Sequence, residues 1–358
     1  MTYYFNNAYI NNKYSLLAST KYNPIIKGSV DYLINDYYLE EKTIELAESK
    51  YQKMTINRLL QRVKLNKSDI DILISGDLQN QILASSLAAS KVSIPTIGIY
   101  SACASFIEGI SIASMYVDNT KSKVIVCTSS HNLVSEKQFR FPVEYGSIRK
   151  RVNTCTATGS VSALISGRKS NIKVESATIG KVIQTNHRDA NDMGSAMAPS
   201  CAEVIYKHLK DTNRKPDYYD LILTGDLGEF GSVIVLKYLK MKYGIEINNL
   251  VDAGSIFYRE KNIYAGSSGP VTLPLVLFDY VLKQKKYRKI LVIGTGSLHS
   301  SLSVNLKVPI PSISHAISLE VKYWYIYIHF FFVDLFVPYH NLYLKKQSLH
   351  QAIWILFL

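Results

Sequence analysis

Short apolar runs alternate with longer segments of helical periodicity along the first 320 residues. The run 93–99 predicts a short buried strand, and apolar residues recur at helical spacing through 106–117. Such alternation predicts parallel strands joined by helical crossovers, which is an α/β fold. The pentapeptide 100–104, with the sequence YSACA, lies between this strand and this helix and places Cys103 where the helix is expected to begin.

The position of Cys103 has chemical consequences. Unpaired backbone N–H groups and the positive end of the helix dipole meet at a helix start, where they lower the pKa of a thiol and stabilise anions. Cys103 can therefore serve as a nucleophile or as the floor of an anion site. An ordinary buried thiol is the third interpretation, because free cysteine is among the most buried residue types.

The chain contains an internal repeat. Segment 71–78 (DILISGDL) matches 220–227 (DLILTGDL) at an offset of 149, and 123–130 (KVIVCTSS) matches 289–296 (KILVIGTG) at an offset of 166. The difference between the two offsets indicates an insertion of about seventeen residues in the second copy. We therefore expect two α/β halves related by a pseudo-two-fold axis.

The repeat also predicts where a site lies. The Cys103 turn falls opposite 265–269 (AGSSG) in the second copy. Ligands of open α/β sheets bind beyond the carboxyl ends of the strands. We expect the two turns to meet there in one shared cleft.

Length and composition are consistent with this fold. At 358 residues, 47% of them hydrophobic, the chain can form one large α/β unit, whose halves we place at 1–170 and 171–320. The net charge of +13 is spread along the chain without a nucleic-acid-binding motif, so no nucleic acid partner is expected. The four cysteines lack metal-binding or disulfide spacing, and we expect no metal or cofactor. The first fifteen residues lack the apolar core of a signal peptide.

The composition changes abruptly in 321–358, which holds both tryptophans of the chain. Its apolar run contains Lys322, His329 and Asp334 and is broken by Pro338, so it makes a poor membrane span. Two interpretations stay open. The segment is an extension produced by a frameshift or by read-through, or it is an aromatic anchor at a membrane interface.

Together these features resemble the thiolase fold, in which two duplicated halves form five layers, αβαβα, and a nucleophilic cysteine begins a buried helix. A closer resemblance is to the family of stage V sporulation protein AD. It covers about 5–320, and its most specific segments are 128–132 (TSSHN) and 192–199 (DMGSAMAP). Further matching segments are 69–81, 101–103, 138–142, 144–146, 154–159, 219–227 and 308–315.

The resemblance implies a binding function on an enzyme fold. Proteins of this family are implied to bind dipicolinic acid, which is pyridine-2,6-dicarboxylate, either free or as its calcium chelate, and to aid its transport into the developing spore. Other stage V sporulation A membrane proteins would be partners, and the chain would pair as a homodimer. Its location would be peripheral on the forespore or spore inner membrane, and otherwise cytoplasmic. The alternative is an active acyltransferase, similar to ketoacyl synthases, that uses Cys103 on a thioester.

The second half lacks the residues that this enzyme would need. Ketoacyl-synthase chemistry requires a thiolate, an oxyanion hole, and a histidine with an asparagine or a second histidine. The strand end 223–226 (LTGD) stands where a related synthase would carry its histidine, and Ser267 stands in place of the asparagine. A carboxylate such as Asp226 beside a thiolate would oppose its formation. Because Asp77 ends the matching strand of the first half, we interpret both aspartates mainly as helix caps.

The same cleft suits a small dianion. Backbone N–H groups at the Cys103 turn can receive one carboxylate, and Arg140 could pair bidentately with the other. His131 follows a strand at the edge where ligands bind. The predicted ligand-binding residues are Cys103, Ser105, His131, Arg140, Ser267 and Ser268.

Structural alternatives exist for most of these residues. His131 could form a hydrogen bond within its own loop. Arg140, which lies between two phenylalanines, could brace a loop or a dimer contact. Ser267 and Ser268 could simply shape a tight turn, since glycines flank them on both sides.

Overall fold

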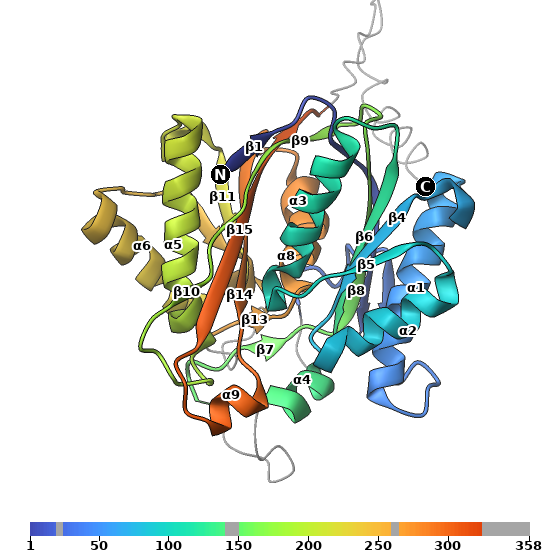
Figure 1. The fold of residues 1–358 in the computed structure, drawn as a ribbon, viewed down its shortest axis with the longest axis horizontal. Helices are drawn as coiled ribbons and strands as arrows, with labels where there is room; N and C mark the ends of the chain where they lie inside the picture. The colour runs from blue at the N-terminus through green and yellow to red at the C-terminus, as the bar shows by residue number, and fades with distance from the viewer. Residues whose placement is uncertain (19–23, 140–149, 259–264, 324–358) are drawn as a thin grey trace, which may run out of the picture. The chain divides into compact units, whose positions relative to one another are not determined.

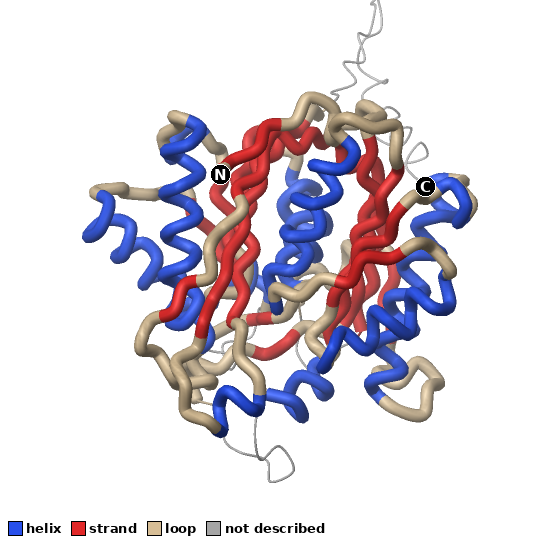
Figure 2. The backbone as a smooth tube through the Cα atoms, in the orientation of Figure 1, coloured by secondary structure: helices blue, strands red, loops and turns tan. Residues whose placement is uncertain are grey.

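Two layers of β-strands face one another across buried helices in the computed structural model (Figure 1). The structure describes residues 1–18, 24–139, 150–258 and 265–323, and these belong to one compact unit, Met1–Tyr323. Further helices cover the outer face of each strand layer (Figure 2). The order of layers is therefore αβαβα, as the sequence predicts. Within the described residues, no helix has both the length and the apolar character needed to cross a bilayer.

The first half supplies one strand layer and the helices on both of its faces. Its strands, in spatial order, are β3 (Tyr32–Ile34), β2 (Tyr9–Ala18), β8 (Gly159–Ser166), β6 (Lys123–Ser130), β4 (Ile72–Gly76) and β5 (Thr96–Gly98). Its outer helices are α1 (Ile44–Val63) and α2 (Leu83–Val92), and its inner helix is α3 (Ser105–Val117).

The second half repeats this arrangement. Its strands, in spatial order, are β12 (Leu250–Asp252), β11 (Leu221–Thr224), β14 (Lys289–Ser297), β15 (Pro311–Val321) and β9 (Ile172–Thr178), with β1 (Thr2–Tyr4) on β9 and β10 (Ile183–Gln184) on β15. Its outer helices are α5 (Met193–Thr212) and α6 (Gly228–Tyr243), and its inner helix is α8 (Thr272–Val276), which continues into a π-helical turn, Leu277–Val281.

Strand order confirms the duplication. The order β2-β8-β6-β4-β5 in one half corresponds to β9-β15-β14-β11-β12 in the other, and two residue pairs between β2 and β9 join the halves. In both halves the two strands next to the edge strand pair in parallel: β4 with β6, and β11 with β14. By contrast, β8 runs antiparallel to β6, and β15 runs antiparallel to β14. The second copy is longer partly because α6 has 16 residues and α2 has 10.

The predicted helix at 106–117 is confirmed as α3. It lies in the central layer, and nine of its 13 residues are buried, as is typical of a helix with apolar residues on all sides. Gly109 allows it to approach β6, because a Cβ at this position would lie 2.6 Å from a methyl group of Val126. Close packing of α3 fixes the turn that precedes it, which contains Cys103.

The prediction of a buried strand at 93–99 is wrong in one respect. The strand exists as β5, but all three of its residues are exposed, and Ile97 is 43% exposed. The reason is topological, because β5 pairs only with β4 and its other side is an open sheet edge. Apolar composition alone does not distinguish a central strand from such an edge.

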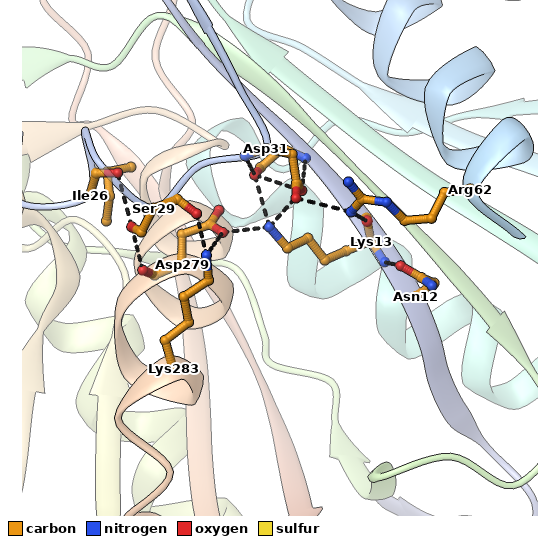
Figure 3. Close-up of polar contacts among 9 residues, drawn as sticks. Asn12, Lys13, Ile26, Ser29, Asp31, Arg62, Asp279 and Lys283 are labelled. Atoms are coloured by element: carbon orange, nitrogen blue, oxygen red, sulfur yellow. Dashed lines mark hydrogen bonds and ion pairs between the residues drawn. The ribbon is translucent and has the colours of Figure 1, made fainter. Parts of the chain in front are cut away.

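A cluster of charged residues, which we call the Lys13 cluster, bridges the two halves (Figure 3). Lys13 on β2 places its Nζ atom 2.7 Å from Asp31 and 2.5 Å from Asp279, which lies in the π-helical turn of the second half. Arg62 contacts Asp31 at 3.0 Å, and Lys283 lies 3.7 Å from Asp279. The Asp279 side chain is fully buried, and its Oδ2 atom has no hydrogen-bond partner among the described residues.

The loops and short elements at one end of the strands complete the described structure. They are α4 (Asn132–Phe139), β7 (Cys155–Thr156), α7 (Ala253–Phe257), β13 (Ser267–Ser268) and α9 (Ser301–Asn305). Figure 1 shows α4, α9 and β7 at the end of the molecule where α3 begins. The strand β7 pairs with β13 and so brings the two halves together near Cys103.

Candidate functional site

The Cys103 turn is a single 3₁₀ turn, Ala102–Ala104, that leads into α3. Ala102 has a φ of 50°, in the left-handed region that L-residues other than Asn and Asp rarely adopt. Ser105 stabilises this turn, because its hydroxyl donates to the Ala102 carbonyl at 2.8 Å and accepts from the Ser101 N–H at 3.0 Å. Ser105 is fully buried and does not line either of the two cavities described below.

Asp226 is the charged residue that meets Cys103. It follows β11 in the second half, and its carboxylate lies close enough to the Cys103 thiol for its charge to act on that group. Two donors hold the carboxylate in place: the Thr295 hydroxyl at 2.9 Å and the Gly269 N–H at 3.0 Å. The thiol of one half therefore faces a fixed carboxylate of the other.

This arrangement opposes thiolate formation. Burial raises the pKa of the Cys103 thiol well above its usual value, and the negative charge of Asp226 raises it further. Burial also raises the pKa of Asp226, to about 6, although the hydrogen bonds from Gly269 and Thr295 favour the charged form. The expected lowering of the Cys103 pKa by the helix start is therefore wrong, because desolvation and the adjacent carboxylate outweigh the helix dipole.

The interpretation of both strand-end aspartates as helix caps holds for only one of them. Asp77 accepts hydrogen bonds from the backbone N–H groups of Gln79 and Ser85, beside the start of α2. In the second half, the corresponding backbone contacts are made by Asp252, which accepts from Leu227 and Gly228 at the start of α6. Asp226 is therefore not needed as the cap of α6, and it faces Cys103.

Replacing Asp226 with asparagine tests this pairing. Without the carboxylate, the Cys103 pKa should fall by about one unit and its alkylation at pH 8 should become about tenfold faster. Iodoacetamide labelling followed by peptide mass spectrometry measures the rate at each cysteine. Cys201 is an internal control, because burial raises its pKa and the charge that raises it further is that of Asp252, not Asp226. An unchanged rate at Cys103 would contradict the pairing.

Two connected cavities open at the Cys103 turn. The inner one has a volume of about 40 Å³ and is lined by Cys103, Thr156, Ser268 and Ser297, among others. The outer one has a volume of about 440 Å³. Four residues line both cavities: Leu78, Tyr100, Phe139 and His299. The cavities therefore form one site, which we call the Cys103 pocket, with a narrow floor and a wider mouth.

The mouth is polar without being cationic. Gln79, Asn80, Gln81 and Gln138 line it. None of the described residues that line either cavity is a lysine or an arginine, and Glu136 lines the inner one. Tyr100 and Phe139 add aromatic surface at the boundary between mouth and floor. The pocket thus offers hydrogen bonds and ring contacts to a ligand.

Sequence reasoning missed His299. It is 5% exposed, its Nδ1 atom lies 3.0 Å from the Ser297 hydroxyl, and its ring lies 5.2 Å from that of Phe139. Its Nε2 atom is buried without a hydrogen-bond partner among the described residues, and burial lowers its pKa. A signal was present in the repeat, since the offset of 166 places His131 two residues from His299.

The structure places His131 outside the Cys103 pocket. Its Nε2 atom lies 3.2 Å from the Tyr37 carbonyl, and its ring stacks on Tyr51 at 6.0 Å. Burial lowers the pKa of His131 to about 4, so the ring is neutral at physiological pH. The contact is structural, but it joins His131 to Tyr37, 94 residues away, and not to its own loop as the structural alternative predicted.

Of the two serines in the turn 267–268, one lines the pocket and the other makes a structural contact. Ser268 lines the inner cavity, and its hydroxyl lies 3.4 Å from that of Thr156. Ser267 instead shares a hydrogen bond of 2.8 Å with Thr272 and does not line the cavity. Of the six predicted ligand-binding residues, Cys103 and Ser268 are brought together in the pocket. Arg140 lies outside the described residues.

The described residues contain no group of three or more His, Cys, Asp or Glu side chains that could hold a metal ion. Glu136 lines the inner cavity, and Asp226, whose charge acts on Cys103, is already bonded to Thr295 and Gly269. Thr156, Ser268 and His299 line the floor beside Cys103 and can form hydrogen bonds to a small ligand.

Comparisons with known proteins agree with this architecture. The family model described as Stage V sporulation protein AD matches residues 2–320. Stage V sporulation protein AD of Bacillus subtilis (strain 168) is 38% identical over 296 residues, which cover 81% of this chain and 87% of that protein.

Solved structures of condensing enzymes share the fold at low sequence identity. 3-oxoacyl-[acyl-carrier-protein] synthase III from Aquifex aeolicus VF5 superposes with a TM-score of 0.55 at 13% identity, covering 87% of this chain and 99% of that one. A variant of OleA from Xanthomonas campestris gives a TM-score of 0.56 at 14% identity, covering 88% and 99%. With its thiolase-like α/β fold and a family model that spans both halves, the chain belongs to the stage V sporulation protein AD family.

Proposed function

We propose that the Cys103 pocket binds dipicolinic acid, free or as its calcium chelate, and that the protein aids its transport into the developing spore. The observation that carries the binding role is the pairing of the Cys103 thiol with the Asp226 carboxylate. A thiol held protonated cannot attack a thioester efficiently. It can still contribute to the floor of a binding pocket.

The lining of the pocket supports a small planar ligand with several acceptor oxygens. The side-chain amides of Asn80 and Gln81 and the Ser268 hydroxyl are donors suited to carboxylate oxygens, whereas those of Gln79 and Gln138 already donate to Glu48 and to the Leu78 carbonyl. Tyr100 and Phe139 provide surfaces for a pyridine ring. The unpaired Nε2 atom of His299 provides one further polar contact.

Partners of the protein form a second part of the proposal. Transport would require other stage V sporulation A membrane proteins, with this chain held peripherally on the forespore or spore inner membrane. A homodimer is supported by the open edge of β5, whose exposed backbone could pair with a second copy. Exposed Ile97 and Tyr100 beside this edge supply apolar area for such a contact.

Calorimetric titration with dipicolinate tests the binding role. We expect saturation at one site per chain, and little heat with benzene-1,3-dicarboxylate, which lacks the ring nitrogen. The Cys103→Ala variant should bind dipicolinate more weakly than the wild type, by a factor of about ten or less, because it loses one contact at the floor. Cys127→Ala is the matched control, since Cys127 is buried in β6 and bonded to Thr55 and Ser160.

The same experiment separates the alternatives. Incubation with acyl-coenzyme A followed by mass spectrometry should give no adduct on Cys103. An adduct together with no heat of dipicolinate binding would favour the acyltransferase and overturn the proposal. Absence of both signals would leave a docking subunit without a ligand. Complete loss of binding in Cys103→Ala would contradict the minor role given to the thiol.

A further inference from the structure

A third cavity lies at the end of β6 and β8 far from the Cys103 pocket. It has a volume of about 360 Å³ and is lined by residues of β2, α1, β6 and β8 and of the turn after β8. Lys123 is the first residue of β6, whereas α4 and β7 lie at the opposite end of these strands (Figure 1). Eight residues of extended strand separate the two ends by about 23 Å.

Three cations converge on this cavity. Lys123, Arg168 and Lys169 line it, and its lining contains no aspartate or glutamate. Within the described part of the chain, none of the three side chains forms an ion pair, although several other surface lysines do. Like charges placed around one hollow repel each other, and an anion at its centre would relieve that repulsion.

The remaining polar groups of the wall leave the cations as the dominant feature. Asn11 bonds to Ser166 and to the Arg168 carbonyl, and Ser170 donates to the Ile10 carbonyl. Asn12 uses its side-chain oxygen to accept from the Lys13 N–H, which leaves its amide N–H₂ group as a further donor. Most hydrogen-bond acceptors of this wall are thus already bonded to other groups of the protein.

A carboxylate and the C-terminal end of a helix lie near the cavity, and both form hydrogen bonds within the protein. The Asp71 carboxylate accepts from the Lys123 backbone N–H at 2.8 Å. At the end of α1, the Lys64 N–H bonds to the Gln61 carbonyl and the Leu65 N–H to the Leu60 carbonyl, so these helix-end oxygens are occupied. Exposed Lys64 lies between Val63 and Leu65, which both line the cavity, and adds a fourth cation at this end.

From this placement we propose that the cavity bounded by Lys123, Arg168 and Lys169 is a binding site for a phosphate group. Arginine and lysine together suit phosphate, because the guanidinium donates two parallel hydrogen bonds and the ammonium adds a compact charge. The phosphate could belong to a soluble anion or to the headgroup of an anionic lipid. The site is separate from the Cys103 pocket and does not depend on the ligand proposed there.

Two titrations of the full chain distinguish the sources. Inorganic phosphate and pyrophosphate, followed by calorimetry, probe a soluble anion. Flotation with vesicles of phosphatidylcholine, with and without phosphatidylglycerol, probes a lipid headgroup. We expect one of these probes to bind, and the variant Lys123→Gln/Arg168→Gln/Lys169→Gln to bind it at least about tenfold more weakly.

A second triple variant controls for total charge. Lys237→Gln/Lys240→Gln/Lys242→Gln removes the same number of cations from α6 and should bind like the wild type. Dipicolinate titration of both variants should match that of the wild type, which shows that each is folded and keeps the two sites distinct. Failure of all probes to bind, or an equal loss in both triple variants, would overturn the proposal.

Discussion

Replacing Lys13 with methionine is expected to lower the free energy of unfolding by about 3–5 kcal/mol. Lys13 is the closest cation to Asp279, whose side chain is fully buried and whose other cation, Lys283, is 3.7 Å away. Removal of Lys13 leaves this carboxylate without adequate compensation in a site closed to water. The loss should be large because the penalty is that of an unpaired buried charge and not merely that of a lost contact.

Urea denaturation of the purified variants measures the effect. The double variant Lys13→Met/Asp279→Asn should recover a substantial part of the loss, since it removes the orphaned charge together with its partner. Lys240→Met is the matched control, because Lys240 is 67% exposed and its partner Glu246 is 65% exposed, and little change is expected there. A loss in Lys13→Met that is no larger than in the control would refute the bridging role of the Lys13 cluster.

Replacing Glu48 with glutamine is expected to stabilise the protein at neutral pH by about 3 kcal/mol and to leave it unchanged below pH 4.5. Glu48 is buried on α1, and burial, with the nearby charge of Asp77, raises its pKa to about 8 from 4.5. Between these values the unfolded chain releases the proton while the folded chain retains it. Stability of the wild type is therefore lost progressively as pH rises from about 4.5 to about 8.

The surroundings of Glu48 can accept the substitution. Its two oxygens receive hydrogen bonds from Gln79 and Ser129, both at 2.9 Å. The Gln79 side-chain oxygen is buried without a partner, so rotation of that amide would present an acceptor to a glutamine N–H₂ group at position 48. A protonated Glu48 could use the same acceptor.

Denaturation of the wild type and Glu48→Gln at pH 4.5 and at pH 7.5 checks this expectation. The two proteins should diverge only at the higher pH. Glu246→Gln serves as a control, because Glu246 is exposed and pairs with Lys240 on the surface. Parallel pH profiles for wild type and Glu48→Gln would show that Glu48 is ionised in the folded protein.

Repetition made most of the fold predictable from the sequence. Matching strand segments at two constant offsets predict two equivalent halves. In the structure the first pair of matching segments forms β4 and β11, and the second pair forms β6 and β14. The exposure of β5 was not predictable, because it depends on which strand lies at the edge. Strand order is a long-range property that a local apolar run does not encode.

The site was predictable at its centre and less so at its walls. The Cys103 turn is local, so the flanking strand and helix indicated it. The contact between Cys103 and Asp226 depends on how two halves pack, and the pKa of the thiol depends on burial that the helix start does not reveal. His131 and His299 occupy similar places in the repeat, yet only His299 lines the pocket, because the loops that follow the two strands differ.

The π-helical turn after α8 sets the direction in which Asp279 faces. A π-turn contains one residue more than an α-helical turn, and each residue of an α-helix advances the chain by about 100°. Loss of that extra residue would rotate Asp279 away from Lys13. The π-helical turn, Asp279 and Lys13 are therefore coupled, and a deletion that restores a regular α-helical turn should cost stability even though it removes no charged residue.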